Sequence, residues 1–166
     1  MNQSGMINLG QLVREKKGVD NTVLVGFSTY SGTVIAAKEW GQKMETMNVP
    51  PAIEGSWDNI LHNIEYKIYD KKQVDKLIIF SKNAEIPEIE RPDNDNVSKG
   101  YDKNRGQRAI GVVYNPVHER YGNYVPTSLS SRYDVLIFID NTTALSPLHI
   151  EPSEDKDLPE TFPTGE

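Results

Sequence analysis

The sequence predicts an α/β fold, in which a mixed β-sheet carries flanking helices, as an incomplete part of a larger α/β domain. Three short apolar runs bounded by polar residues predict interior strands: KLIIF at 76–80, AIGVVY at 109–114 and VLIFI at 135–139. Two segments with helical spacing of apolar residues, 6–17 and 56–68, are mixed with strand candidates along the chain. This mixture favours a layered α/β architecture.

The N-terminal elements begin with the 6–17 segment, which predicts a helix that ends at Gly18, a residue suited to a helix C-terminus. Residues 22–27 are β-branched and apolar, which predicts a strand buried on both faces. Residues 33–37 form a second extended candidate after a turn at Gly32. The short separation suggests a hairpin, and a strand that turns into a helix also fits the pattern.

A third strand candidate lies at 43–49, and the two prolines that follow it end it because proline cannot donate to a β-ladder. Ser56 is a suitable N-cap for the next helix. That helix has apolar residues at i, i+3, i+4 and i+7, which predict one buried face: Trp57, Ile60, Leu61 and Ile64.

The predicted organisation is a domain at 1–150 and a polar C-terminal tail at 151–166. Within the domain, 81–108 is a polar loop that is longer than an ordinary connection, and 115–134 is interpreted as mostly loop. The two predicted helices are too few to cover both faces of a parallel sheet. This shortage indicates that the chain forms only part of a larger domain.

Composition excludes several classes of protein. The formal net charge of −6 argues against a nucleic-acid partner, which needs a clustered basic face. The absence of cysteine excludes disulfides, thiolate metal sites and a cysteine nucleophile. No signal peptide or membrane span is found, so we expect a cytoplasmic protein with no membrane partner. The largest basic group is diluted by Asp and Asn and is interpreted as a solvated loop: Lys99, Lys103, Arg105 and Arg108.

The stretch TVLVGFSTYSGTV at 22–34 raises the question whether Ser28 is a hydrolase nucleophile. The nucleophile elbow of α/β-hydrolases requires Gly-x-Ser-x-Gly, in which small residues permit a strained turn. Tyr30 stands where the second glycine is required. The end of a strand and its turn are therefore favoured over a nucleophile.

The turn after this strand supplies the substrate-pocket candidates. If the strand is parallel to its neighbours, its C-terminal loop lies where open α/β sheets place ligands. Thr29, Tyr30, Ser31 and Thr33 are therefore expected to line a pocket without taking part in covalent chemistry.

The three histidines offer no catalytic arrangement by their spacing. His62 is interpreted as a partly buried helix residue, His118 lies in a polar loop and His149 begins the tail. A triad of Ser28, His118 and Asp140 can be written, but no spacing supports it. We predict no catalytic residue in this chain.

Metal binding is not indicated by the sequence. No pair of histidines or carboxylates has ligand spacing such as H-E-x-x-H. The segment PDNDN at 92–96 is similar to the start of a calcium loop, but Ser98 stands where the loop needs glycine and Asn104 where it needs glutamate. We predict neither a metal site nor a cofactor.

The large aromatic residues are interpreted as packing groups rather than as a substrate platform. This applies to an aromatic and basic loop, formed by Tyr114, Arg120, Tyr121 and Tyr124, and to the two tryptophans, Trp40 and Trp57.

Long phrases of the sequence resemble the C-terminal half of the erythromycin esterase family. The resemblance rests on NLGQLVREK, VLVGFSTYSGTVIAAKEWG, MNVPPAIEGSWDNILH, RGQRAIGVVYNPVHERYGNYVPTSLSSRYDVLIFID and ETFPTGE, in this order. Family members are far longer, and their preceding part carries motifs of the types G-E-x-x-H-G and A-H-N-x-H, which this sequence lacks. Met1 thus falls inside the parent domain, which suggests a truncated gene, a split reading frame or a misplaced start.

The resemblance implies a metal-independent hydrolase in which histidine, aided by carboxylates, activates water against a macrolide lactone or another carboxylic ester, as in a response to an antibiotic. None of the family's catalytic residues maps onto a position of this chain. We therefore expect a part of the enzyme that is inactive alone and meets its small-molecule ester substrate only with the missing half. The alternative is a non-catalytic assembly module that pairs with a separately encoded N-terminal half. A weaker option is a self-contained esterase built on Ser28.

Overall fold

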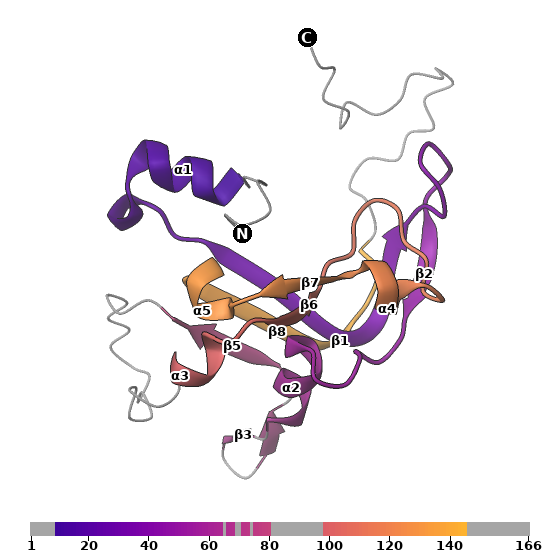
Figure 1. Ribbon diagram of the computed structural model, residues 1–166. Helices are drawn as coiled ribbons and strands as arrows, with labels where there is room; N and C mark the ends of the chain where they lie inside the picture. The colour runs from indigo at the N-terminus through magenta and orange to yellow at the C-terminus, as the bar shows by residue number, and fades with distance from the viewer. Residues whose placement is uncertain (1–8, 65, 69–70, 74, 81–97, 146–166) are drawn as a thin grey trace.

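The computed structural model describes residues 9–64, 66–68, 71–73, 75–80 and 98–145 (Figure 1). In chain order its elements are α1 (Leu9–Lys17), the short 3-10 helix η2 (Val19–Asn21), β1 (Val25–Ala36), β2 (Glu45–Val49), α2 (Trp57–Asn63), β3 (Tyr66–Ile68), β4 (Lys71–Gln73), β5 (Lys76–Ile79), α3 (Ser98–Tyr101), β6 (Arg105–Arg108), α4 (Glu119–Gly122), β7 (Tyr124–Thr127), α5 (Leu129–Arg132) and β8 (Val135–Thr142). Four strands form one sheet in the order β2-β1-β8-β5, and β3-β4 and β6-β7 form separate pairs.

The centre of the sheet is the parallel pair of β1 and β8. β8 lies between β1 and β5, in the interior position predicted for 135–139, with Val25 opposite Val135 and Thr29 opposite Ile139. β5 pairs antiparallel with β8, and β2 pairs antiparallel with the second half of β1. This mixed sheet with helices confirms the predicted α/β class.

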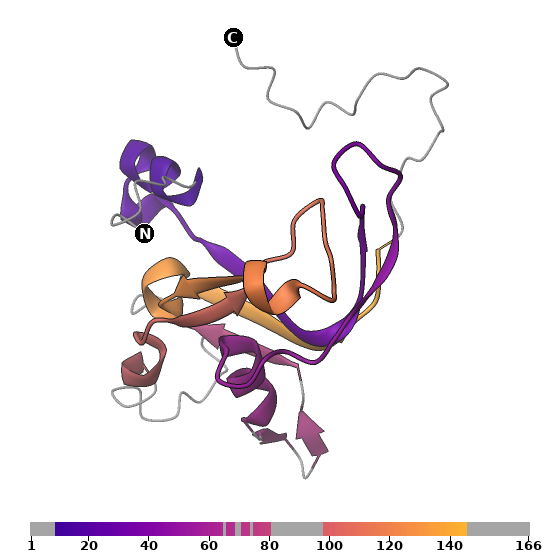
Figure 2. The ribbon, with the colours of Figure 1, turned by 45° about the vertical axis from the view of Figure 1, so that its right-hand side comes forward.

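The strand β1 corrects the expectation of two short strands with a turn between them. It runs without a break from Val25 to Ala36, so Ser28 and Gly32 lie inside it. Its first part pairs with β8 and its second part pairs with β2, and these ladders leave no room for a turn. Its first four side chains alternate between exposed and buried, so the prediction of burial on both faces at 22–27 is wrong. Figure 2 shows how the strand curves along its length.

The segment 109–114 is not a strand, although its apolar run predicted one. The strand is β6, directly before it, which pairs antiparallel with β7. Within 109–114, Val113 makes an isolated parallel bridge to Ala37, and the Tyr114 side chain is buried in a small core cluster. A short apolar run has the same composition whether it packs as a strand or as an irregular buried segment, so periodicity could not separate them.

Two segments interpreted as loop contain regular structure. Residues 98–108 hold α3 and β6, and 115–134 hold α4, β7 and α5. Each of these elements is four residues long, which is too short for a periodic pattern to reveal. Other parts of the sequence predictions lie outside the described residues: 6–8, 81–97 with its PDNDN segment, His149 and the tail at 151–166.

Several predicted elements are confirmed. α1 and β2 lie within the predicted 6–17 and 43–49 ranges. Gly18 follows α1 with a φ of 87°, and its N–H still donates to the Arg14 carbonyl oxygen at 2.8 Å. Ser56 caps α2, because its hydroxyl oxygen accepts a hydrogen bond from the Asn59 backbone N–H.

Two boundaries differ from the sequence predictions. α2 ends at Asn63 instead of reaching residue 68, because the chain turns extended at Ile64 and β3 begins at Tyr66. Among the described strands, β5 lies at the edge of the sheet and not in its interior, and its Leu77 side chain is exposed.

One face of the sheet carries the main hydrophobic core. Trp57 and Leu61 of α2 pack there against Leu136 and Phe138 of β8, with side chains of α3 and α5 in the same cluster. The views in Figures 1 and 2 place these helices and the β6-β7 pair on this side of the sheet. Trp57 is buried as predicted, whereas the prediction for Trp40 is wrong: it stands exposed in the turn after β1.

The aromatic loop is only partly a packing element. Tyr114 is fully buried and Tyr124 is half-buried, which confirms the packing interpretation for these two residues. Tyr121 is 80% exposed, because its position in α4 points away from the core.

The opposite face of the sheet is apolar, and no described residue forms a layer over it. We call it the open face and define it by five residues of three adjacent strands: Val25 and Phe27 of β1, Ile137 and Ile139 of β8, and Leu77 of β5. Phe27 is 66% exposed and Leu77 is 57% exposed. No helix in the described part of the chain is long and apolar enough to cross a membrane.

Gly32 is expected to tolerate no side chain. Its φ is +132°, and a Cβ atom would lie 2.0 Å from the Thr142 carbonyl oxygen of β8. Backbone strain and overlap with a neighbouring strand should make Gly32→Ala lower the free energy of unfolding by roughly 2–5 kcal/mol in a urea titration. Gly111→Ala, where a Cβ meets no atom within 4 Å, is the matched control. Equal effects of the two substitutions would contradict this close approach.

Candidate functional site

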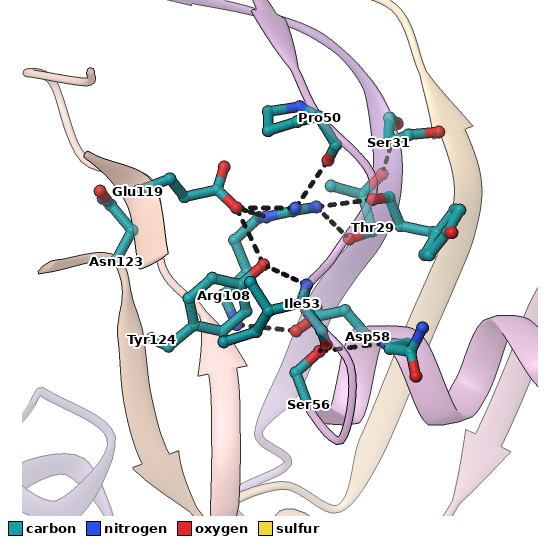
Figure 3. Close-up of polar contacts among 12 residues, drawn as sticks. Thr29, Ser31, Pro50, Ile53, Ser56, Asp58, Arg108, Glu119, Asn123 and Tyr124 are labelled. Carbon is teal, nitrogen blue, oxygen red and sulfur yellow. Dashed lines mark hydrogen bonds and ion pairs between the residues drawn. The ribbon is translucent and has the colours of Figure 1, made fainter. Parts of the chain in front are cut away.

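A buried guanidinium group joins β6 to the middle of β1. Arg108 ends β6, and its side chain uses all five of its N–H donors inside the protein (Figure 3). Nε and Nη2 donate to Glu119 Oε1 at 3.0 and 2.8 Å, and Nη2 also donates to the Pro50 carbonyl oxygen at 2.7 Å. Nη1 donates to the carbonyl oxygens of Thr29 at 3.0 Å and Tyr30 at 2.7 Å.

Glu119, at the start of α4, supplies the compensating charge. Its Oε1 also accepts a hydrogen bond from the Tyr124 hydroxyl at 2.8 Å, and its Oε2 accepts one from the Tyr114 hydroxyl. Burial, together with the carboxylate, raises the pKa of Tyr124 to about 12 and raises the pKa of Tyr114 as well. Both phenols therefore remain protonated donors near neutral pH.

A second buried carboxylate, Asp58, lies next to this ion pair. Its Oδ1 accepts the Ser28 hydroxyl at 2.5 Å, and its Oδ2 accepts the Arg108 backbone N–H at 2.8 Å. Burial raises the pKa of the Asp58 carboxyl, while the hydrogen bonds from Ser28 and the backbone oppose this rise. The carboxyl thus connects α2, β1 and β6 from within the core.

These charged groups are closed to a ligand. Arg108 has no N–H donor left for a substrate anion, and each carboxylate oxygen of Asp58 and Glu119 already accepts at least one hydrogen bond. The network therefore acts as a structural clamp that positions the middle of β1. The interpretation of Arg108 as part of a solvated basic loop is wrong, because its side chain is only 2% exposed.

Ser28 occupies a position unlike that of a nucleophile. It lies inside β1 on the core face, where its hydroxyl donates to Asp58. A serine nucleophile needs an adjacent base that removes its proton, and no histidine within the described residues bonds to it. His118 is exposed directly before α4, and Asp140 pairs with His62. Ser28, His118 and Asp140 therefore do not form the triad considered in the sequence analysis.

His62 of α2 forms a pair with Asp140 of β8 on the core face. Its Nδ1 lies 2.6 Å from Asp140 Oδ1, and its ring stacks on the Tyr30 ring with 3.6 Å between the centroids. The side chain is 34% exposed, which confirms the prediction of a partly buried helix residue. The Asp140 backbone N–H donates to the Asp75 carboxylate at 2.8 Å, so this cluster also links β8 to the start of β5.

The four substrate-pocket candidates lie in β1, not in a loop, and they divide between the two faces of the sheet. Thr29, Ser31 and Thr33 lie on the side of the open face: the Ser31 hydroxyl accepts a hydrogen bond from the Asn141 side chain at 3.1 Å, and Thr33 accepts one from a backbone N–H at 2.9 Å. Tyr30 lies on the core face against His62. The structure therefore groups three of the four residues and separates the fourth.

A groove of about 590 Å³ lies beside β1 and β8. Its lining includes Phe27 and Ile139 of the open face together with the polar side chains of Thr29, Thr33 and Asn141. The carboxyl ends of parallel strands are the place where open α/β sheets bind ligands. The groove combines an apolar surface with a few polar groups, which is typical of sites for small organic molecules.

Sequence analysis missed the buried network of Arg108, Glu119 and Asp58. Two signals were present: Asp58 follows Trp57 at the N-terminus of an apolar-faced helix, and Arg108 directly precedes an apolar run. Neither signal identifies a partner, because Arg108 is 11 positions from Glu119 and 50 positions from Asp58. In the described part of the chain, no group of three or more potential metal ligands occurs.

Removing the Arg108 guanidinium should cost much of the stability. Arg108→Met leaves the Glu119 carboxylate buried without its cation, and we expect the free energy of unfolding to fall by about 3–5 kcal/mol in a urea titration. Arg120→Met, at an exposed position of α4, is the matched control and should change it by less than about 0.5 kcal/mol. A loss below about 1 kcal/mol for Arg108→Met would rule out the clamp.

Asp58 should make stability fall with rising pH. Its folded-state pKa lies above the ordinary value of 3.8, so the folded chain binds this proton more tightly than the unfolded chain. The resulting stabilisation is complete below the ordinary pKa and is lost as pH rises through the folded-state pKa. The free energy of unfolding of Asp58→Asn minus that of the parent chain should therefore increase as pH rises from 3.8. All other groups cancel in this difference, and a constant or opposite trend would be inconsistent with the raised pKa.

Two solved structures are similar to this chain in fold. One is described as a succinoglycan biosynthesis protein and matches 82% of this chain at 20% identity with a TM-score of 0.57. The other, a protein from Bacillus cereus, matches 81% at 19% identity with a TM-score of 0.56. Each match covers only 28% of the solved chain, so this chain spans less than a third of their length. Identities this low show a shared fold.

A family model extends this likeness to sequence. The model described as erythromycin esterase matches residues 1–142. The match includes the core, the buried clamp and most of the groove lining, because only the described residues 143–145 fall outside it. The chain therefore belongs to the erythromycin esterase family.

Proposed function

We propose that this chain is the C-terminal part of an erythromycin esterase-like hydrolase and forms one wall of its cleft for a carboxylic ester. The groove beside β1 and β8 carries the proposal, since it lies at the carboxyl ends of two parallel strands. Val34 and Ile110 of its lining offer apolar contact to an ester, and Thr29, Thr33 and Asn141 offer polar contacts. A macrolide lactone is the substrate class that family membership suggests.

The same proposal holds that the chain alone does not hydrolyse esters. Hydrolysis by activated water needs a histidine or carboxylate that is free to accept a proton near the ester carbonyl. Asp58 and Glu119 are closed by internal hydrogen bonds, and His62 pairs with Asp140, stacks on Tyr30 and is not among the residues that line the groove. The general base would come from the part of the family domain that this chain does not span.

A second candidate function is a non-catalytic assembly module that pairs with a separately encoded N-terminal half. The open face favours it, because a helix-flanked α/β sheet with a parallel centre normally has both faces covered. The two candidates differ in whether the assembled complex hydrolyses an ester.

The test compares the purified chain with the chain co-expressed with the polypeptide encoded upstream. We expect the chain alone to hydrolyse erythromycin and p-nitrophenyl acetate at the rate of the buffer, and the complex to exceed that rate. Within an active complex, Thr29→Val should lower kcat/KM several-fold through loss of one polar contact, whereas Thr46→Val on β2 should not.

Three outcomes decide between the candidates. Hydrolysis of the lactone by the purified chain, well above the buffer rate, would refute inactivity alone. A stable but inactive complex would favour the assembly module. An active complex in which Thr29→Val and Thr46→Val behave alike would remove the groove from the substrate site.

A further inference from the structure

We infer that the open face is a docking surface for an amphipathic helix from the remaining part of the family domain. The inference rests on the proposed function only in assigning that part to the same hydrolase. It goes further by naming the surface, the residues and the kind of element that cover it.

The open face is a continuous apolar patch across three strands. Leu77 of β5 lies directly opposite Ile137 of β8, and Ile137 lies opposite Phe27 of β1, so these three side chains form one row. Val25 and Ile139 extend the patch along the neighbouring strands on the same face. Phe27, on the interior strand β1, is 66% exposed, and its neighbours in the patch, Leu77 and Val25, are 57% and 48% exposed, so the patch is a contiguous exposed apolar surface.

The contrast with the other face indicates that the exposure is not a general property of the sheet. On the core face, the intervening residues Leu136 and Phe138 are completely buried beneath α2 and its neighbours. All-parallel sheets are covered on both faces, and the parallel pair of β1 and β8 at the centre of this mixed sheet carries the apolar residues that such covering requires. One layer is thus present within the described chain, and the second layer must come from elsewhere.

The dimensions of the patch fit a single helix. Three adjacent strands are about 10 Å wide, which is close to the diameter of a helix with its side chains. From Val25 to Ile139, opposite Thr29, the patch extends along four residue steps, or roughly 13 Å, which equals about nine residues of helix. An apolar stripe over two to three turns would therefore cover the row formed by Phe27, Ile137 and Leu77.

The length of the similar proteins identifies the source of this helix. The solved chains are more than three times as long as the part that matches this chain, and they share its fold. A helix from that additional part would supply the missing layer. The helix would end before the polar residues Thr33 and Asn141, since these side chains offer no apolar contact. The part of the groove that these residues line would therefore remain accessible.

Photo-cross-linking in cells tests the surface without choosing a partner beforehand. The full chain carries p-benzoylphenylalanine at Phe27, and a second version carries it at Tyr121, an exposed aromatic residue of α4 on the covered side. After irradiation of cells of the source organism, the cross-linked peptides are sequenced. We expect position 27 to react with a helix of a polypeptide that matches the N-terminal part of the family domain, at a yield at least tenfold above position 121.

Each other result overturns the inference. A cross-link from position 27 to a second copy would make the open face a homodimer interface. A cross-link to residues 1–8, 81–97 or 146–166 of the same chain would make it an internal contact. Reaction with a non-helical segment, or equal yields at both positions, would exclude the docking helix.

A charge substitution separates this inference from the proposed function. Phe27→Asp should abolish co-purification with the partner polypeptide, and Tyr121→Asp should preserve it. Both substitutions are at exposed positions, and circular dichroism confirms that the variants are folded. A complex that requires Phe27 but hydrolyses no ester would uphold the surface and refute the hydrolase. An active complex that forms equally well with Phe27→Asp would uphold the hydrolase and refute the docking surface.

Discussion

The fold depends on the complete satisfaction of one buried cation. Arg108 is almost fully removed from water, and a buried guanidinium is tolerated only when a counter-charge and hydrogen-bond acceptors replace its hydration. Glu119 supplies the charge, and three backbone carbonyl groups supply the remaining acceptors. Because two of these carbonyls belong to Thr29 and Tyr30, the clamp holds β1 directly before Gly32, where its pairing with β2 begins. It thereby determines which side chains of β1 face the groove.

This constraint leaves the charged network without free polar groups: Arg108 and Ser28 also line the groove, but their donors are already hydrogen-bonded within the protein. On the core face, Asp58 accepts a hydrogen bond from Ser28 and Glu119 accepts one from Arg108. His62 pairs with Asp140 on the same face. On the other face, hydroxyl groups of β1 adjoin an apolar patch and a groove. Under the proposed function, the reactive groups would come from the part of the family domain that this chain does not span, and the apolar patch offers a docking surface to an element of that part.

The sequence predicted the class of fold and several elements but not their connections. Residues 135–139 formed the expected interior strand, and Ser56 capped the expected helix, because both depend on local patterns. The continuity of β1 through Gly32 depends on two partner strands distant in sequence, and no local pattern contains them. The same reason applies to the site: Thr29 and Thr33 line the groove, and their role as substrate-pocket residues stays a prediction. The bond from Arg108 to Glu119 joins two segments that were both interpreted as loop.

The most direct measurement is the accessibility of residue 27 to a thiol reagent. The chain contains no cysteine, so Phe27→Cys and Tyr121→Cys each introduce a single reactive thiol. In the purified chain, both thiols should react with a maleimide at similar rates. In intact cells of the source organism, we expect the thiol at position 27 to be protected at least tenfold while the thiol at position 121 reacts as before. Equal labelling of both positions in cells would contradict the conclusion that a further layer covers the open face.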